Sequence, residues 1–531
     1  THGRGLPYTT FRELHLRPLG HVTVVQLTTR RGPAEILVAA ASGTRYTPSK
    51  PRRHEPAIAS RAASVAIGCG ARTEAMSVHL LTADILVPMD ASRSVLTDAG
   101  VAIDGDAIVS VGVREKLLQL HPDAAHTHLA DRVLMPGLIN GHHHSGLLRG
   151  TAEHLPVYEW LRVHIDPMHR VLEPDDAAAA AWLCYAEGLL SGTTTVVDMW
   201  RYMDRAASAA VELGNRLVTV NYVGEHPDFD YFDTLDDNER MLRDWTGAGG
   251  GRIMPWVGLE HPFYADDAGR ARAVAMARDY GAGIYTHCSE SELDVRIFAE
   301  RTGLRPMHAL ERMGFFDTPR AMIAHAVWLD ADEIELVAER GVGVSHNPVS
   351  NMKLASGIAP IAEMLEAGVN VAIGTDGEKE NNNLDMFEEM KVASLLGKLR
   401  KMDAAAMDSW QVLEMATIGG ARAIGQGDRL GSLEPGKQAD LIAVRTDTPR
   451  MTPLLPAGSH ANIHHNLVHA VRGSDVDRVV VAGRTVVADG ILTTADLGEL
   501  IAEVRGRVPA LFERRAAYLA SVGDPAGLFS Q

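Results

Sequence analysis

The sequence predicts an α/β protein: a (β/α)8 TIM-type barrel with a small composite β-sandwich domain formed from both flanks of the chain. Eight short apolar runs in its middle part are each followed by a helical pattern, which is typical of parallel strands joined by crossover helices. The eight units occupy about 245 residues, the usual span of a closed barrel. The flanks instead alternate apolar and polar residues between turn residues, as small antiparallel sheets do.

Each predicted barrel strand is an apolar run of four to eight residues. The strands are Leu134–Ile139, Thr194–Met199, Leu217–Tyr222, Ile253–Leu259, Gly283–His287, Ala321–Ala326, Val342–Ser345 and Val369–Gly374. Predicted helices between them include Asp175–Leu190, Arg205–Leu213, Asp267–Tyr280, Ala331–Arg340 and Ile361–Ala367. Several are followed by a glycine where a left-handed cap belongs: Gly192, Gly214, Gly281, Gly341 and Gly368.

The flanking segments predict the composite domain, over 76–133 and 431–495, around a barrel at 134–430. The segments expected to form its sheet, punctuated by Gly or Asp, are Val78–Val87, Gly100–Val111 and Arg132–Leu134 before the barrel, and Ala439–Val444, Val468–Val471 and Asp477–Val487 after it. Apolar residues recur at helical spacing over Asp496–Ala520, which predicts a helix within 496–531 that packs on the outside.

Residues 1–75 differ from the rest in charge. They hold eleven Arg or Lys and four Glu, whereas residues 76–531 hold 40 basic and 64 acidic side chains. The basic residues do not align on one amphipathic face. We therefore expect a weakly structured basic tail, or an upstream extension read through before a natural start at Met76, with an organelle transit peptide as the alternative.

Composition excludes several classes of function. A net charge of -17 repels a phosphate backbone, so we expect no nucleic-acid partner. No apolar run approaches the length of a membrane span, and the three cysteines, Cys69, Cys184 and Cys288, cannot form a disulfide framework. We expect a cytoplasmic homo-oligomer that binds a small molecule, with Cys184 and Cys288 filling space.

Histidine and aspartate cluster where predicted strands end, which is where barrel enzymes place their chemistry. His142 and His144 share one face of the first strand, and His143 points away. Later strands end at His287, His325 and Asp376. Imidazoles and a carboxylate around one open position are typical of a catalytic zinc or iron site. His464, His465 and His469 lie in the outer sheet region, where structural or surface roles are favoured.

The motifs at these positions resemble the amidohydrolase superfamily, and within it the triazine hydrolases and methylthioadenosine/S-adenosylhomocysteine deaminases. The likeness covers about residues 77–495. It rests on Pro136-Gly137-Leu138-Ile139-Asn140-Gly141-His142-His143-His144, Leu148-Arg149-Gly150, Glu159-Trp160-Leu161, His287-Cys288-Ser289-Glu290, Ser345-His346-Asn347-Pro348-Val349-Ser350-Asn351 and Gly374-Thr375-Asp376-Gly377.

This resemblance implies four ligands for one divalent metal ion per chain, zinc or iron: His142, His144, His287 and Asp376. It implies that Glu290 is the proton shuttle and that His325 orients the attacking water or the leaving group. The chain has no lysine between Lys116 and Lys353, so a carbamylated lysine cannot bridge two metals. A mononuclear mechanism follows, in which Asp376 takes a proton from water and Glu290 protonates a ring nitrogen.

Departures from the family pattern bear on the substrate, which we expect to contact Trp160, His169, Glu260 and Glu380. The deaminases hold ribose hydroxyls with a glutamate at the position where this chain has His169. This difference argues against a nucleoside as the substrate. Glu260 and Glu380 add carboxylates that we expect to face the pocket; pairing with Lys379 or solvent is the alternative.

The reaction that we expect is hydrolytic removal of an exocyclic amino group from a small nitrogen heterocycle. The alternative is the same substitution with another leaving group, such as nitrite, chloride or an alkylamine, on an azole or triazine-like ring. A catalytically silent scaffold barrel is a minor alternative, which the intact ligand set and Glu290 disfavour.

Overall fold

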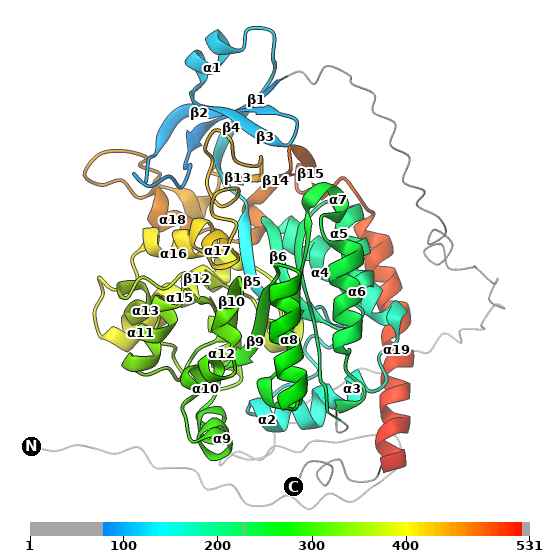
Figure 1. Ribbon diagram of the computed structural model, residues 1–531. Coiled ribbons are helices and arrows are strands. Elements are labelled where there is room, and N and C mark those ends of the chain that lie inside the picture. The colour runs from blue at the N-terminus through cyan, green and yellow to red at the C-terminus, as the bar shows by residue number, and fades with distance from the viewer. Residues whose placement is uncertain (1–77, 227–228, 523–531) are drawn as a thin grey trace, which may run out of the picture. The chain divides into compact units, whose positions relative to one another are not determined.

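The computed structural model describes residues 78–226 and 229–522. A parallel barrel and a separate mixed sheet make up this part of the chain (Figure 1). The expected basic extension, 1–75, lies outside the described residues. None of the described helices is both long and apolar enough to cross a membrane.

Eight parallel strands close into the barrel, as predicted. They are β5 (Leu138–His143), β6 (Thr193–Trp200), β7 (Arg216–Asn221), β8 (Ile253–Gly258), β9 (Gly283–Cys288), β10 (Arg320–His325), β11 (Gly343–His346) and β12 (Val371–Ile373). Nearly all their residues are buried, which explains why they read as continuous apolar runs. The barrel closes where Ile373 of β12 pairs with Asn140 of β5.

Helices alternate with the barrel strands and cover them (Figure 1). They are α4 (Pro174–Leu190), α5 (Met203–Leu213), α6 (Leu235–Trp245), α7 (Ala248–Gly251), α8 (Asp267–Asp279), α9 (Glu292–Thr302), α10 (Pro306–Arg312), α11 (Ala331–Glu339), α12 (Pro348–Lys353), α13 (Ile361–Glu366), α14 (Glu378–Asn381), α15 (Met386–Lys401), α16 (Ser409–Ala416) and α17 (Ile418–Ala423).

The ends of these helices follow from local sequence. Asp330 begins α11 with a capping box, in which its side chain accepts from the Glu333 amide at 3.0 Å. Asp266 caps α8 by accepting from the Gly269 amide at 2.7 Å. Gly214 follows α5 with φ 99°, a left-handed conformation that glycine adopts without strain.

The flanks form one mixed sheet of eight strands, drawn from both ends of the described chain. Its order is β16 (Ile491–Leu492), β15 (Arg484–Ala488), β14 (Val476–Val481), β13 (Leu441–Arg445), β4 (Ala125–Pro136), β1 (His79–Leu86), β2 (Leu96–Asp104) and β3 (Ala107–Val113), with α1 (Arg114–Leu120) following β3. Only β1 and β4 pair in parallel. The sheet curls back on itself, because Ile108 of β3 bonds to the backbone of Gly436 and Lys437 before β13.

Two strand predictions need correction. The run Leu134–Ile139 is not one strand: Leu134–Pro136 belongs to β4, and the barrel begins at Leu138. Gly137 separates the two, and a Cβ there would lie 2.2 Å from the Thr194 side chain. Val468–Val471 is not a strand either, because Val468 lies in helix α18 (Ile463–His469), where the His464 ring stacks on Trp410 at 4.9 Å.

A buried ion pair joins the barrel to the mixed sheet. Arg216 of β7 donates to both carboxylate oxygens of Asp440, at 2.6 and 2.9 Å, and Asp440 also accepts from the Ala482 amide at 2.8 Å. The two charged side chains are only 2% and 5% exposed. This bidentate pair fixes the sheet at the amino end of β7.

The segment between β5 and α4 covers one side of the barrel mouth. It contains α2 (Val157–Trp160), a π-helical turn over Leu161–Ile165 and α3 (Asp166–His169). The final helix, α19 (Leu497–Val522), contacts α3 and α4. Arg515 of α19 donates to the Val163 carbonyl at 2.7 Å, which ties the two segments together.

Candidate active site

Four side chains converge at the carboxyl end of the barrel. His142 lies on β5, His144 follows it, and His287 lies on β9. Nε2 of His287 lies 3.1 Å from Nε2 of His142 and 3.1 Å from Nε2 of His144. Oδ1 of Asp376 lies 3.5 Å from Nε2 of His142 and 3.5 Å from Nε2 of His144. Ligands held 2.0–2.1 Å from one tetrahedral ion lie about 3.3 Å apart. The three imidazole nitrogens therefore lie close enough to hold one metal ion, with Asp376 beside two of them.

The hydrogen bonds of these imidazoles support the same interpretation. Nδ1 of His144 donates to the Met199 carbonyl, and Nδ1 of His287 donates to the Glu260 carbonyl at 2.7 Å. Because carbonyls only accept, both Nε2 atoms carry lone pairs, and these face each other without a proton between them. Burial lowers the pKa of His287 to about 4 and that of His144 well below its usual value. Neutral imidazoles aimed at one point fit a divalent cation.

The other two converging side chains are held by a tyrosine and a serine. Nδ1 of His142 is 3.0 Å from the Tyr285 hydroxyl. The Ser350 hydroxyl donates to Oδ2 of Asp376 at 2.7 Å. Sequence reasoning did not single out Tyr285, which lies on β9; Ser350 was only part of a quoted motif. By contrast His143 donates to the Asp376 carbonyl at 3.0 Å, so it points away as predicted.

A carboxyl and an imidazole lie beside this cluster. Nε2 of His325, at the end of β10, is 3.8 Å from Oε2 of Glu290 and 3.8 Å from Oδ2 of Asp376. Ser356 donates to Oε1 of Glu290 at 3.1 Å, and Asn351 lies 3.0 Å from Nδ1 of His325. Burial raises the pKa of Glu290. Burial disfavours the charged form of His325, but the Glu290 and Asp376 carboxylates outweigh it and raise the His325 pKa.

The backbone is strained at two of these positions. His325 has φ 73° and Asp376 has φ 58°, both in the left-handed region that glycine favours. Such strain is concentrated at functional sites, where the surrounding structure holds the residue in place. Asp376 is held by its amide, which donates to the His142 carbonyl at 3.0 Å.

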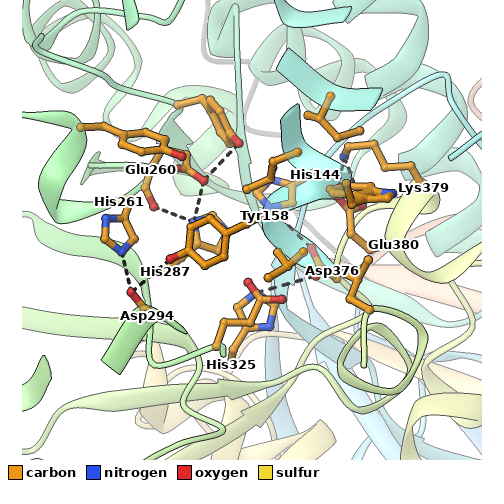
Figure 2. Close-up of a pocket in the computed structure, with 18 of the residues that line it drawn as sticks. His144, Tyr158, Glu260, His261, His287, Asp294, His325, Asp376, Lys379 and Glu380 are labelled. Atoms are coloured by element: carbon orange, nitrogen blue, oxygen red, sulfur yellow. Dashed lines mark hydrogen bonds and ion pairs between the residues drawn. The ribbon is translucent and has the colours of Figure 1, made fainter. Parts of the chain in front are cut away.

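The cluster opens into a pocket with aromatic and charged walls (Figure 2). Apart from the cluster residues, Glu290 and His325, the walls contain Val157, Tyr158, Trp160, Leu161, Ile165, Trp200, Tyr222, Glu260, His261, Tyr264, Asp294, Leu354, Lys379 and Glu380. Trp160 lines the pocket, and its indole donates to the Ala152 carbonyl at 3.0 Å. Sequence reasoning missed Tyr158, His261 and Asp294; Tyr158 is directly beside the quoted motif Glu159-Trp160-Leu161.

His169 lies behind the pocket wall. It is 1% exposed and is not one of the lining residues. Its ring stacks on Tyr222, with 4.7 Å between centroids and 12° between planes. Tyr222 itself lines the pocket, so His169 supports the wall from behind.

The two expected extra carboxylates have different surroundings, and Figure 2 shows them on opposite sides of the pocket. Glu380 forms an ion pair with the buried Lys379 at 3.0 Å. This is the pairing that the sequence indicated as the alternative to an unpaired carboxylate. The Lys379 ammonium also lies 4.5 Å from the centre of the Trp200 ring. Glu260 follows β8 and accepts from the Tyr222 hydroxyl at 3.2 Å through Oε1. Among the described residues, nothing bonds to its Oε2.

The sequence matches the Amidohydrolase family over residues 133–486, which includes the whole barrel and the convergent cluster. The chain belongs to the amidohydrolase family. The two buried cysteines, Cys184 and Cys288, are free and contribute nothing to the cluster of this amidohydrolase.

Curated relatives and solved structures extend the comparison. The chain is 36% identical to a 5-methylthioadenosine/S-adenosylhomocysteine deaminase of Syntrophomonas wolfei, over 79% of this chain and 96% of that protein. It is 39% identical to a 5'-deoxyadenosine deaminase of Methanopyrus kandleri, over 77% and 94%. A zinc-bound adenosine deaminase from Xanthomonas campestris has a TM-score of 0.76 at 33% identity, over 82% and 98%. A zinc complex of atrazine chlorohydrolase from Arthrobacter aurescens has a TM-score of 0.72 at 26% identity, over 80% and 99%.

Proposed function

We propose that this amidohydrolase removes an exocyclic amino group from a small nitrogen heterocycle by hydrolysis. The observation that carries the proposal is the convergence of three imidazole Nε2 atoms and Asp376 beside the Glu290 carboxyl. The relatives named as deaminases of adenosine derivatives support the same reaction. The balanced change is simple: water adds to the ring carbon, the carbon–nitrogen bond breaks, and ammonia leaves.

We propose that His142, His144, His287 and Asp376 hold one divalent ion per chain, and that the ion is zinc. Zinc is bound in two of the similar solved structures, and a donor set of imidazoles and one carboxylate suits it. Such an ion lowers the pKa of a bound water to about 7 and so supplies hydroxide near neutral pH.

The chain's own groups move the protons in this proposal. Asp376 accepts a proton from water. Its Oδ1 faces the nitrogens that would hold the metal ion, and the Ser350 hydroxyl fixes the carboxylate through Oδ2. The carboxylate would therefore lie beside the water that attacks the ring. Glu290 protonates the ring nitrogen beside the attacked carbon and then assists the amino group in leaving. His325 lies within 3.8 Å of both carboxylates, where it orients the water or the leaving group.

A second candidate is the same substitution with a different leaving group, such as chloride, nitrite or an alkylamine. The similarity to atrazine chlorohydrolase favours keeping it. The two candidates share the water and the proton transfers, and differ only in the bond that breaks.

One experiment tests both candidates. The purified full-length chain is assayed for bound metal and then given a panel of amino-, chloro- and nitro-substituted purines, pyrimidines, triazines and azoles. The panel includes 5'-deoxyadenosine and methylthioadenosine. Ammonia release that depends on the metal supports deamination, whereas chloride, nitrite or alkylamine release supports the second candidate. Metal-loaded protein that releases none of these products contradicts both and favours the silent scaffold.

A further inference from the structure

Glu260 has surroundings unlike those of the other carboxylates in the pocket. The pocket contains Glu260, Glu290, Asp294, Asp376 and Glu380. Three of the others form an ion pair within the pocket: Glu380 with Lys379, Asp294 with His261 at 2.9 Å, and Glu290 with His325. Asp376 belongs to the metal-ligand cluster. On Oε1, Glu260 accepts from the Tyr222 hydroxyl, and Nδ1 of His287 lies 3.7 Å from the same oxygen. Glu260 is 5% exposed, and its Oε2 has no hydrogen-bond partner among the described residues.

The nearest histidine does not neutralise this carboxylate. Nδ1 of His287 lies 3.7 Å from Oε1 of Glu260. The proton on that nitrogen is already donated to the Glu260 backbone carbonyl, at 2.7 Å. Glu260 Oε2 is therefore an acceptor whose donor must come from outside the chain, since leaving a buried polar oxygen unpaired is costly.

The acceptor is held rigidly in place. The Glu260 amide donates to the Val223 carbonyl at 3.1 Å, and its carbonyl accepts from the His287 amide at 3.2 Å. Tyr222, which holds Oε1, is packed between the His169 ring on its face and the Phe232 ring at 4.8 Å. A fixed oxygen of this kind discriminates strongly between ligands with and without a matching donor.

The position of the Glu260 carboxyl indicates which part of a substrate it would contact. The Glu260 carboxyl lies on the Nδ1 side of His287, whereas Nε2 of the same ring faces the metal-ligand cluster. The leaving group must lie on the Nε2 side, next to Glu290 and Asp376. Glu260 therefore faces a different edge of a heterocycle that reacts there.

We propose that Glu260 selects the substrate by accepting a hydrogen bond from a second N–H group of the heterocycle, one that is not on the leaving amino group. This inference rests on the proposed function. The substrate class is a planar heterocycle with a second amino group, a ring N–H or an amidine-like edge. The base of an adenosine derivative lacks such a donor, because its only N–H bonds are on the amino group that leaves.

The test uses two pairs of compounds that differ by one amino group and have no ring N–H: 9-methyladenine with 9-methyl-2,6-diaminopurine, and adenosine with 2,6-diaminopurine riboside. The metal-loaded full chain is compared with Glu260→Leu, which removes the acceptor, and with Glu260→Gln, which keeps one oxygen but replaces the other by an NH2 donor. Glu339→Gln, at an exposed position of α11, is the matched control. Specificity is measured as kcat/KM where ammonia is released and as Kd by calorimetry where it is not.

In the parent, we expect the diamino member to be preferred at least tenfold in one pair or both. That preference falls below threefold in Glu260→Leu, is intermediate in Glu260→Gln and is unchanged in Glu339→Gln. Thermal unfolding of each variant verifies that it is folded. If Glu260→Leu does not fold, Glu260→Gln decides the test: a preference lower than that of the parent supports the inference, and an unchanged preference overturns it.

Three results would overturn the inference: equal treatment of both members of both pairs, no measurable binding of any member, or a preference that persists without the Glu260 carboxylate. The competing role for Glu260 is to bind the ribose hydroxyls, and a comparison of adenosine with 2',3'-dideoxyadenosine, which lacks them, detects it. If the parent prefers adenosine and Glu260→Leu loses that preference, Glu260 binds ribose and the proposal is wrong. Preferential binding without any ammonia release would contradict the proposed function and leave this inference standing.

Discussion

Replacing Glu290 by glutamine tests the proton transfer that the proposed mechanism assigns to it. The amide keeps an oxygen for the Ser356 hydroxyl, which donates to Oε1 at 3.1 Å, so the side chain keeps its position. None of the proposed metal ligands is altered. What is lost is the transferable proton of a carboxyl whose pKa burial raises, and which therefore retains that proton more readily near neutral pH.

The expected loss follows from this. A general acid contributes about 10²–10⁴-fold in rate, or about 3–5 kcal/mol of transition-state stabilisation. Because the residue acts only in the transition state, kcat and kcat/KM should fall together by that factor. The assay is steady-state ammonia release, with metal content measured on the same preparation.

Glu292→Gln is the matched control, since Glu292 is exposed two residues further along, in the first turn of α9. It should behave as the parent does. If Glu290→Gln keeps kcat within threefold, or loses its metal, the assignment of Glu290 as the proton shuttle is wrong.

Three further predictions concern the metal, the fold and the extension. His287→Ala should lose the ion and nearly all activity yet keep its circular dichroism spectrum, and an active metal-free variant would refute the ligand set. Asp440→Ala leaves Arg216 buried without its partner and should lower the free energy of unfolding by about 3–5 kcal/mol in denaturant titrations; a change below 1 kcal/mol would contradict this. A chain that begins at Met76 should release product at the parent rate, and aggregation or inactivity would show that residues 1–75 are needed.

The barrel and the cluster at its carboxyl end could be predicted from the sequence because both depend on local patterns. Strands buried on both faces give continuous apolar runs, and alternation along a strand places His142 and His144 on one face. The same reasoning could not find the boundary at Gly137, because the apolar run continues across it from the sheet into the barrel.

The roles of the substrate-facing residues depend on contacts between distant segments, which no local pattern contains. Sequence reasoning grouped Glu260 with Glu380, but folding gives Glu380 a lysine and leaves one oxygen of Glu260 without a partner. His169 was expected at the substrate, yet Tyr222 lies between its ring and the pocket. Motif position predicts which loop carries a residue but not which layer of the wall it occupies.

The order of the mixed sheet has a consequence for synthesis of the chain. Strand β4 pairs on one side with β1 and on the other with β13, which is about 300 residues later in the sequence. A growing chain on the ribosome therefore carries β4 with one open edge while the whole barrel is being made, and open edges recruit other strands. Chaperone demand should be greatest in that interval, and fragments that stop before Leu441 should aggregate even though they contain every residue of the candidate active site.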